Sequence, residues 1–173
     1  LAGISAEVVA AGGVETTSDD SLQVIYCPEQ GFTTKAYAGY FWNYQEGNGV
    51  TIYLETQGSI PYVMIFKSED LIGEPFDYIK EQYTPYIQQQ YGNDLVGYLE
   101  YEAFEVGGKS LPAACYTYRL QGYLVDMLRI YDSTGDTTVV YTAKYVQYGG
   151  DDEPDDAEAM LVLDTVIHNF QAD

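Results

Sequence analysis

From residue 22 onward, hydrophobic and polar positions alternate with the two-residue period of β-strands more often than with a helical period. Runs rich in β-branched and aromatic residues are closed by Gly, Pro, Asn or Asp, which punctuate strands and tight turns. The pattern predicts strands within 24–27, 50–54, 62–66, 96–106, 112–120, 122–131 and 137–148. The last four runs are joined by short Gly-rich or Asp-rich turns, which predicts an antiparallel meander.

The run at 122–131 differs from the others because it is apolar on both faces. Leu124, Leu128 and Ile130 occupy one face, and Val125 and Met127 occupy the other. A strand of this kind needs a packed layer on each side of its sheet. We therefore expect it to lie in the interior of the sheet.

Two segments have helical spacing instead. Residues 75–91 begin with a proline at the first helical position and stop before Gly92. Pro85 must break or kink this helix because it removes an interior hydrogen bond. Residues 154–169 form the second predicted helix. The elements together predict an α+β fold, in which an antiparallel β-sheet of six to seven strands is flanked by helices on both faces.

The first 21 residues have the composition of a linker or of the remnant of a processed leader, with Ala, Gly, Ser, Thr and acids around a short apolar patch. We expect residues 22–173 to form a single domain. The start at Leu1, the scarcity of Lys and the acidity favour a secreted protein, located outside the cell or at its surface.

Charge narrows the range of partners. The chain has 173 residues, of which 27 are Asp or Glu and seven are Lys or Arg, and its formal net charge is −20. Such a surface repels nucleic acid and anionic lipid. No apolar run is long enough for an integral membrane segment. The remaining partners are neutral or basic ligands: a sugar, a peptide or a protein.

The sequence has few residues that could form a metal-binding or redox site. Cys27 and Cys115 lack the spacing of a zinc site, and the pair fits either one long-range disulfide or two buried thiols. The acidic run 151–158 lacks the order of an EF-hand loop. It fits weak calcium binding, or the solvated first turn of a helix, where acids favour the positive end of the dipole. We predict no metal site and no cofactor.

Catalysis has few candidates. His168 is the only histidine, and one imidazole without a paired nucleophile does not make a catalytic site. Glu100 and Glu102 fall on the same face of a predicted strand, as the two carboxylates of a glycosidase do. A secreted hydrolase that uses this pair is therefore the alternative function, and no catalytic residue is assigned in the preferred one.

Aromatic residues supply the candidate ligand-binding site. The chain has 19 Tyr, six Phe and one Trp, and several cluster before the Gly-rich turn at 47–49. Tyrosine and tryptophan on a loop provide large contact areas for sugars, peptides or proteins at low entropic cost. The alternative is that the segment is anchored in the core by Phe41 and the tryptophan. The candidates are Tyr37, Tyr40, Trp42 and Tyr44.

Three sequence features occur together in this order of elements: Gly31-Phe32, Trp42 about ten residues later, and the closing sequence Val166-Ile167-His168-Asn169-Phe170. With these features, the chain resembles the PsbP-like family, in particular its secreted and lipoprotein branch in bacteria. The resemblance implies an antiparallel sheet with helices packed on both faces, the PsbP-like sandwich, and a binding or scaffold role. The preferred function is thus a non-enzymatic extracellular binding or scaffold module.

Overall fold

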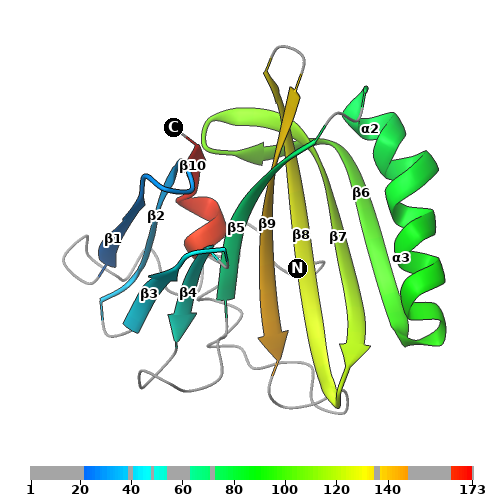
Figure 1. Ribbon diagram of the computed structural model, residues 1–173, viewed down its shortest axis with the longest axis horizontal. Coiled ribbons are helices and arrows are strands. Elements are labelled where there is room, and N and C mark those ends of the chain that lie inside the picture. The colour runs from blue at the N-terminus through cyan, green and yellow to red at the C-terminus, as the bar shows by residue number, and fades with distance from the viewer. Residues whose placement is uncertain are drawn as a thin grey trace.

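The computed structural model describes residues 22–38, 41–47, 49–53, 63–70, 73–134, 137–147 and 165–172. The strands are β1 (Leu22–Cys27), β2 (Phe32–Tyr37), β3 (Phe41–Gln45), β4 (Gly49–Tyr53), β5 (Val63–Asp70), β6 (Leu95–Val106), β7 (Lys109–Leu120), β8 (Tyr123–Thr134), β9 (Thr137–Gln147) and β10 (Gln171–Ala172). The fold is a sheet-rich α+β fold (Figure 1). Residues 1–21 lie outside the described residues, so the proposed domain boundary at residue 22 stays a prediction.

The strands form two antiparallel sheets. The large sheet has seven strands in the order β3-β4-β5-β9-β8-β7-β6, and the small sheet has three in the order β1-β2-β10. Strands β6 to β9 follow one another as antiparallel neighbours, which confirms the predicted meander. Strand β8 lies between β7 and β9, as its two apolar faces required.

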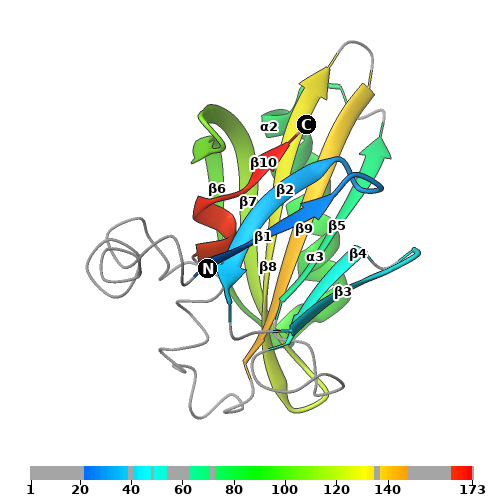
Figure 2. The ribbon, with the colours of Figure 1, turned by 90° about the vertical axis from the view of Figure 1, so that its left-hand side faces the viewer.

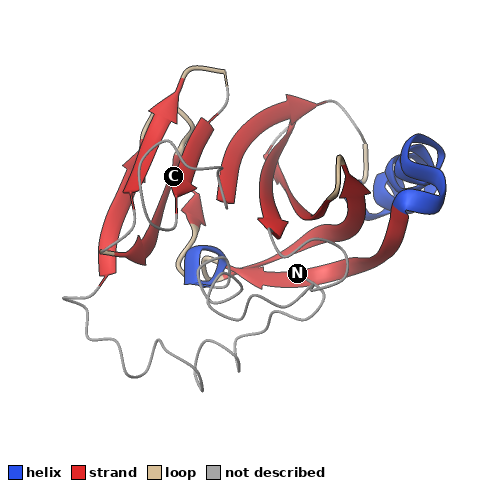
Figure 3. Cartoon of the chain, turned by 90° about the horizontal axis from the view of Figure 1, so that it is seen from below, coloured by secondary structure: helices blue, strands red, loops and turns tan. Residues whose placement is uncertain are grey.

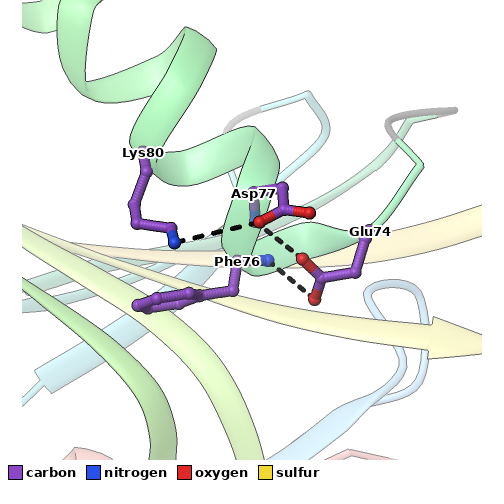
Figure 4. A network of polar contacts seen from close by, with 4 residues as sticks. All are labelled: Glu74, Phe76, Asp77 and Lys80. Carbon is purple, nitrogen blue, oxygen red and sulfur yellow. Dashed lines mark hydrogen bonds and ion pairs between the residues drawn. The ribbon is translucent and has the colours of Figure 1, made fainter.

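One long helical stretch packs on the large sheet. It consists of α2 (Pro75–Tyr78), the π-helical segment η2 (Ile79–Tyr83) and α3 (Thr84–Tyr91), followed by the 3₁₀ turn η3 (Gly92–Asp94). Its start is capped by Glu74, whose carboxylate accepts hydrogen bonds from the backbone N–H groups of Phe76 at 3.1 Å and Asp77 at 2.7 Å (Figure 4). The Lys80 ammonium lies 4.5 Å from the centre of the Phe76 ring and 3.8 Å from Asp77. These contacts tie down the first turn.

Pro85 does not divide this stretch into two separate helices. The backbone N–H of Thr84 bonds to the carbonyl of Ile79, five residues back, so the turn before the proline is wider than an α-helical turn. Proline lacks an N–H and crowds the carbonyl four residues before it. The π turn is where the helix departs from α geometry, and the chain stays helical on both sides of it.

Each face of the large sheet has its own hydrophobic core. Beneath the helix, Ile79 and Ile87 pack against Ala114, Tyr116, Tyr118, Val125, Met127, Tyr131 and Val140. On the other face, β7 and β8 pack against the small sheet through Ile25, Cys27, Phe32, Ala36, Cys115, Leu128, Ile130, Val166, Ile167 and Phe170. Burying each large apolar side chain contributes about 1.5–3 kcal/mol.

The described residues show one long helical stretch, so a sheet flanked by long helices on both faces is not shown. Figures 1 and 3 place this stretch, α2 to α3, on one side of the large sheet, and the small sheet with the short helical segment at residues 165–168 on the other. The second layer is a sheet because Phe32, Thr34 and Ala36 alternate with half-exposed neighbours, which is the period of a strand. Of the helix predicted at 154–169, residues 165–168 are helical and 154–164 lie outside the described residues.

Both cysteines are buried and unbridged in this structure. Cys27 comes from β1 and Cys115 from β7, and both belong to the core between the two sheets. This matches the expectation of two buried thiols that act as small apolar side chains.

Candidate functional site

The aromatic segment predicted to form a recognition loop lies largely on strands. Tyr37 ends β2, and Trp42 and Tyr44 belong to β3, which pairs with β4. The loop expectation was wrong for these residues because aromatic side chains favour extended backbone, and the turn begins only after β3, at residues 46–47. Tyr40 lies outside the described residues.

Tyr37, Trp42 and Tyr44 are half-buried, and each packs against the core between the sheets. Phe41 is 50% exposed, and its side chain leaves β3 on the opposite face from Trp42. These aromatic residues do not line the two cavities described next. Their role in ligand binding stays a prediction.

A polar groove lies where the two sheets meet. One cavity of about 330 Å³ is lined by residues of β2, the β6–β7 turn and the C-terminal segment: Thr33, Thr34, Lys35, Gly107, Gly108, His168, Asn169, Phe170 and Gln171. An adjoining cavity of about 220 Å³ is lined by Glu105, Val106 and three residues of the first cavity, Gly107, Gly108 and His168. Figure 2 looks onto this side of the molecule, with β2 and the C-terminal segment in front of the large sheet. We call the two cavities together the His168 groove.

The C-terminal segment is held on β2 by hydrogen bonds. The buried hydroxyl of Thr34 donates to the carbonyl of Val166 at 2.5 Å, and β10 pairs with β2 through Gln171 and Thr33. The Asn169 side chain donates to the Thr165 carbonyl at 2.9 Å, which caps the helical residues 165–168. The alternation of β2 then turns Thr33 and Lys35 away from the core, toward the groove.

The β6–β7 turn forms the opposite wall. Gly107 has φ +58°, and a Cβ atom there would lie 2.8 Å from the carbonyl oxygen of Phe170. Gly108 also has positive φ, but a Cβ atom there would meet nothing within 4 Å. The turn can approach the C-terminal segment this closely because Gly107 has no side chain.

The groove offers mainly neutral hydrogen-bonding groups. Thr33 contributes a hydroxyl, Asn169 and Gln171 contribute amides, and the glycine turn contributes backbone. Lys35, His168 and Glu105 are its charged or titratable members. Oε1 of Glu105 accepts a hydrogen bond from the Ser110 hydroxyl at 2.7 Å, so this serine is bonded to a carboxylate and not to the histidine. The geometry suits binding of a neutral polar ligand.

Nothing local in the sequence marks this groove. Its walls come from β2, from residues 107–108 and from residues 168–171, which are far apart along the chain. The alternation of apolar and polar residues at positions 32–36 is a signal for β2, and the sequence predicts a turn at Gly107-Gly108. Their meeting depends on how the small sheet packs on the large one, which no short-range pattern encodes.

The two candidate carboxylates of the hydrolase alternative have different surroundings. Glu100 accepts a hydrogen bond from the Thr84 hydroxyl at 2.7 Å, which connects β6 to the helix. Glu102 is exposed and lies within the irregular stretch of the β6–β7 pairing, between Tyr101 and Phe104. Neither glutamate lines the His168 groove.

Tyrosines concentrate beneath the helix as well. The ring of Tyr83 packs edge-on against Tyr116 at 5.6 Å between centroids, and Tyr91 stacks on Tyr118 at 4.0 Å. Burial raises the pKa of Tyr116 and Tyr118 well above the usual value, and raises that of Tyr131 to about 12. These hydroxyls therefore stay protonated at any physiological pH.

Among the residues that the structure describes, no group of three or more His, Cys, Asp or Glu side chains is placed to hold a metal ion. The acidic run 151–158, the candidate for calcium, lies outside them. No helix in the described part of the chain is long and apolar enough to span a bilayer.

Comparison with known proteins gives a fold. No family model and no curated protein matches the chain. Among solved structures, the chain is similar to LpqN of Mycobacterium tuberculosis, a protein involved in cell envelope biogenesis, with a TM-score of 0.52 and 14% identity over 92% of this chain and 95% of that one.

Two further likenesses are weaker. The Ran-binding protein Mog1p of Saccharomyces cerevisiae gives a TM-score of 0.47 at 9% identity, over 87% of this chain and 95% of that one. A protein of Bacteroides thetaiotaomicron gives 0.45 at 10% identity, over 87% of this chain and 48% of that one. The fold is therefore similar to that of LpqN, and membership in the PsbP-like family stays a prediction.

Proposed function

We propose that this chain is a non-enzymatic binding module of the cell envelope, which takes a neutral, hydrogen-bonding ligand in the His168 groove. The observation that carries the proposal is the lining of the groove, in which Thr33, Asn169 and Gln171 present a hydroxyl and two amides at the junction of the sheets. Sites for small polar ligands are concave and use a few such groups to orient the ligand.

The charge of the chain favours a neutral ligand. With a formal net charge of −20, the surface repels anions at long range, and the groove itself holds few charged groups. A sugar matches hydroxyl and amide groups, and a peptide backbone matches them as well. Of the two ligands, we favour a sugar because the groove is small and its walls carry mainly polar groups.

Two likenesses support the proposed location. LpqN, whose fold this chain resembles, is involved in cell envelope biogenesis. The sequence resembles the secreted and lipoprotein branch of the PsbP-like family, for which a position outside the cell or at its surface is expected. A binding or scaffold role in the envelope is consistent with both. Cell fractionation of the native host tests the location, and recovery in the cytoplasm would contradict it.

Ligand binding can be tested with neutral oligosaccharides. The chain is screened on an array of neutral glycans, and each hit is measured by isothermal titration calorimetry. Gln171→Ala and His168→Ala should each weaken binding about tenfold, as loss of a hydrogen bond to a desolvated ligand does. Gln89→Ala is the matched control, because Gln89 is exposed on α3, away from the groove. Binding that both groove variants retain would contradict the assignment.

The absence of catalysis is tested separately. Each glycan that binds is incubated with the chain, and the products are analysed by mass spectrometry. We expect intact ligand. Turnover that Glu100→Gln or Glu102→Gln abolishes would support the hydrolase alternative instead.

A further inference from the structure

The helix-side face of the large sheet carries two cations that the His168 groove does not use. Arg129 on β8 lies directly opposite Thr142 on β9, and Lys144 lies opposite Met127. Arg129 and Lys144 are therefore diagonal neighbours on one face, a relation that places Cβ atoms about 7–8 Å apart. On the far side of Thr142, β5 contributes Phe66.

Tyrosines hold the guanidinium of Arg129. Its Cζ atom lies 4.0 Å from the centre of the Tyr83 ring and 5.5 Å from that of Tyr131. Its Nε donates a hydrogen bond to the Tyr131 hydroxyl at 3.0 Å. Stacking on one ring and bonding to another fix the plane of the side chain.

Neither cation has a carboxylate partner within the described residues. The ion pairs of Lys80 with Asp77 and of Lys109 with Asp132 involve neither of them. Burial by itself lowers the pKa of Arg129, but the hydroxyls of Tyr131 and Tyr83 raise it above its ordinary value. The chain has 27 acids and seven Lys or Arg, so its composition favours an acid partner for each cation. Arg129 and Lys144 are half-buried and have no such partner among the described residues.

The two cations also repel each other. Burial, and then the positive charge of Arg129, lower the pKa of Lys144. The Lys144 ammonium lies 5.8 Å from the centre of the Phe66 ring. Two positive charges on the same partly buried face repel each other more strongly than they would in water. An anion between Arg129 and Lys144 would remove this repulsion.

The two terminal nitrogens of the Arg129 guanidinium group are available to a ligand. In the part of the chain that the structure describes, these nitrogens make no hydrogen bond, and they are not among the buried polar atoms that lack a partner. Their hydrogen-bonding capacity is therefore unused within the described residues. The hydroxyl of Thr142, directly opposite Arg129, is completely buried and has no hydrogen-bond partner among the described residues, which is uncommon for a buried polar group.

We propose that Arg129 and Lys144 form a binding site for the carboxylate of a small organic acid with an apolar body. The free fork of Arg129 matches a planar carboxylate in a bidentate geometry, and Lys144 supplies the second positive charge. Tyr83 and Phe66, both half-buried, flank the site on either side and contact the apolar body.

A monoanion is selected over a dianion. The net charge of −20 repels each negative charge of the ligand, whereas the short-range attraction comes from one fork and one ammonium. This site lies on the opposite face of the large sheet from the His168 groove. The proposal therefore does not depend on the proposed function of that groove.

The test uses benzoate, acetate and inorganic phosphate as probes on the full chain. Binding is followed by calorimetry and by the NMR signals of the Arg129 Nε–H and the Lys144 side chain. We expect saturable binding of benzoate, weaker binding of acetate and of phosphate, and a rise in the pKa of Lys144 when benzoate binds. Arg129→Gln and Lys144→Gln should each weaken benzoate binding about tenfold or more, as loss of a charge-assisted hydrogen bond does.

Lys80→Gln is the matched control, because it removes one positive charge from the exposed helix surface and should leave benzoate binding unchanged. Arg129→Lys keeps the charge without the fork and should bind with intermediate affinity. If Arg129→Gln fails to fold, Lys144→Gln decides alone, since Lys144 makes no ion pair within the described residues. The absence of saturable benzoate binding, equal losses in Lys80→Gln, or phosphate binding tighter than benzoate would each overturn the proposal.

Discussion

The hydroxyl of Thr84 lies 2.7 Å from Oε2 of Glu100 and 2.6 Å from the hydroxyl of Tyr116, so one side chain of α3 connects the helix to both β6 and β7. Thr84 has one proton to donate, and the carboxylate can only accept it. Tyr116 must then donate to Thr84. Burial raises the pKa of Tyr116 and keeps its proton in place.

Replacing Thr84 by Val removes both hydrogen bonds with little change of shape. The Glu100 carboxylate and the buried Tyr116 hydroxyl then lose a partner, which costs about 1–3 kcal/mol per group. We expect the free energy of unfolding in urea to fall by about 2–6 kcal/mol. Thr84→Ser retains the hydroxyl and should recover most of that loss. Equal stability of the Val variant and the wild type would show that the contacts contribute nothing net.

Alkaline pH should destabilise the fold through its buried tyrosines. Burial raises the pKa of Tyr131 to about 12, whereas an unfolded tyrosine ionises near the usual 10. The stabilising effect is fully present below pH 10 and is lost as the pH rises toward about 12, because only the unfolded chain gives up the proton in that window. Each such tyrosine lowers the free energy of unfolding by about 1.4 kcal/mol per pH unit.

Urea unfolding at several pH values between 9 and 12 measures this slope. Tyr118→Phe removes one buried tyrosine whose pKa is also raised, so its slope should be shallower by about 1.4 kcal/mol per pH unit. Tyr86→Phe, at an exposed position on α3, is the matched control and should leave the slope unchanged. Identical slopes in all three proteins would show that global charge, and not tyrosine burial, controls alkaline unfolding.

The two glycines of the β6–β7 turn should respond differently to alanine. Both have positive φ, which costs a residue with a Cβ atom about 1–2 kcal/mol. Only at Gly107 would the new atom also meet the Phe170 carbonyl oxygen, at 2.8 Å. Gly107→Ala should therefore destabilise the fold more than Gly108→Ala, as measured by thermal unfolding, and should displace the C-terminal segment. Equal melting temperatures would contradict the close approach.

Apart from β3, which was expected to be a loop, the sequence predicted the large sheet well because its strands carry local signals. Strand β8 is apolar on both faces, and the turns at 107–108 and 121–122 separate strands that pair with their neighbours in sequence. The helix from Pro75 to Tyr91 was predictable for a similar reason, since its capping residue, its first-turn proline and its spacing all agree. These elements are specified within short windows of sequence.

The small sheet and the candidate sites were not predictable in this way. Strand β10 has two residues, Gln171 and Ala172, and it forms by pairing with β2, which lies near the other end of the chain. A segment this short carries no strand pattern of its own. The site at Arg129 depends on the register that places Thr142 and Phe66 beside it. Register between strands determines which side chains meet, and a single sequence does not report it.

Trp42 separates the two roles that the aromatic segment can have. It is half-buried on β3, an edge strand, and packs against the core between the sheets. Complete removal of a buried aromatic side chain costs about 3–5 kcal/mol, so Trp42→Ala at this half-buried position should cost about 2 kcal/mol in urea unfolding. Phe41→Ala, at a 50% exposed position on the opposite face, should change stability by no more than about 0.5 kcal/mol. Trp42→Phe keeps an aromatic ring and should retain most of the stability.

If Tyr37, Trp42 and Tyr44 also form a recognition surface, a bound glycan or peptide must shift the fluorescence of the single tryptophan. Trp42→Phe must then weaken binding of that ligand without unfolding the chain. A ligand that binds Trp42→Phe as tightly as the wild type would restrict the segment to a role in packing.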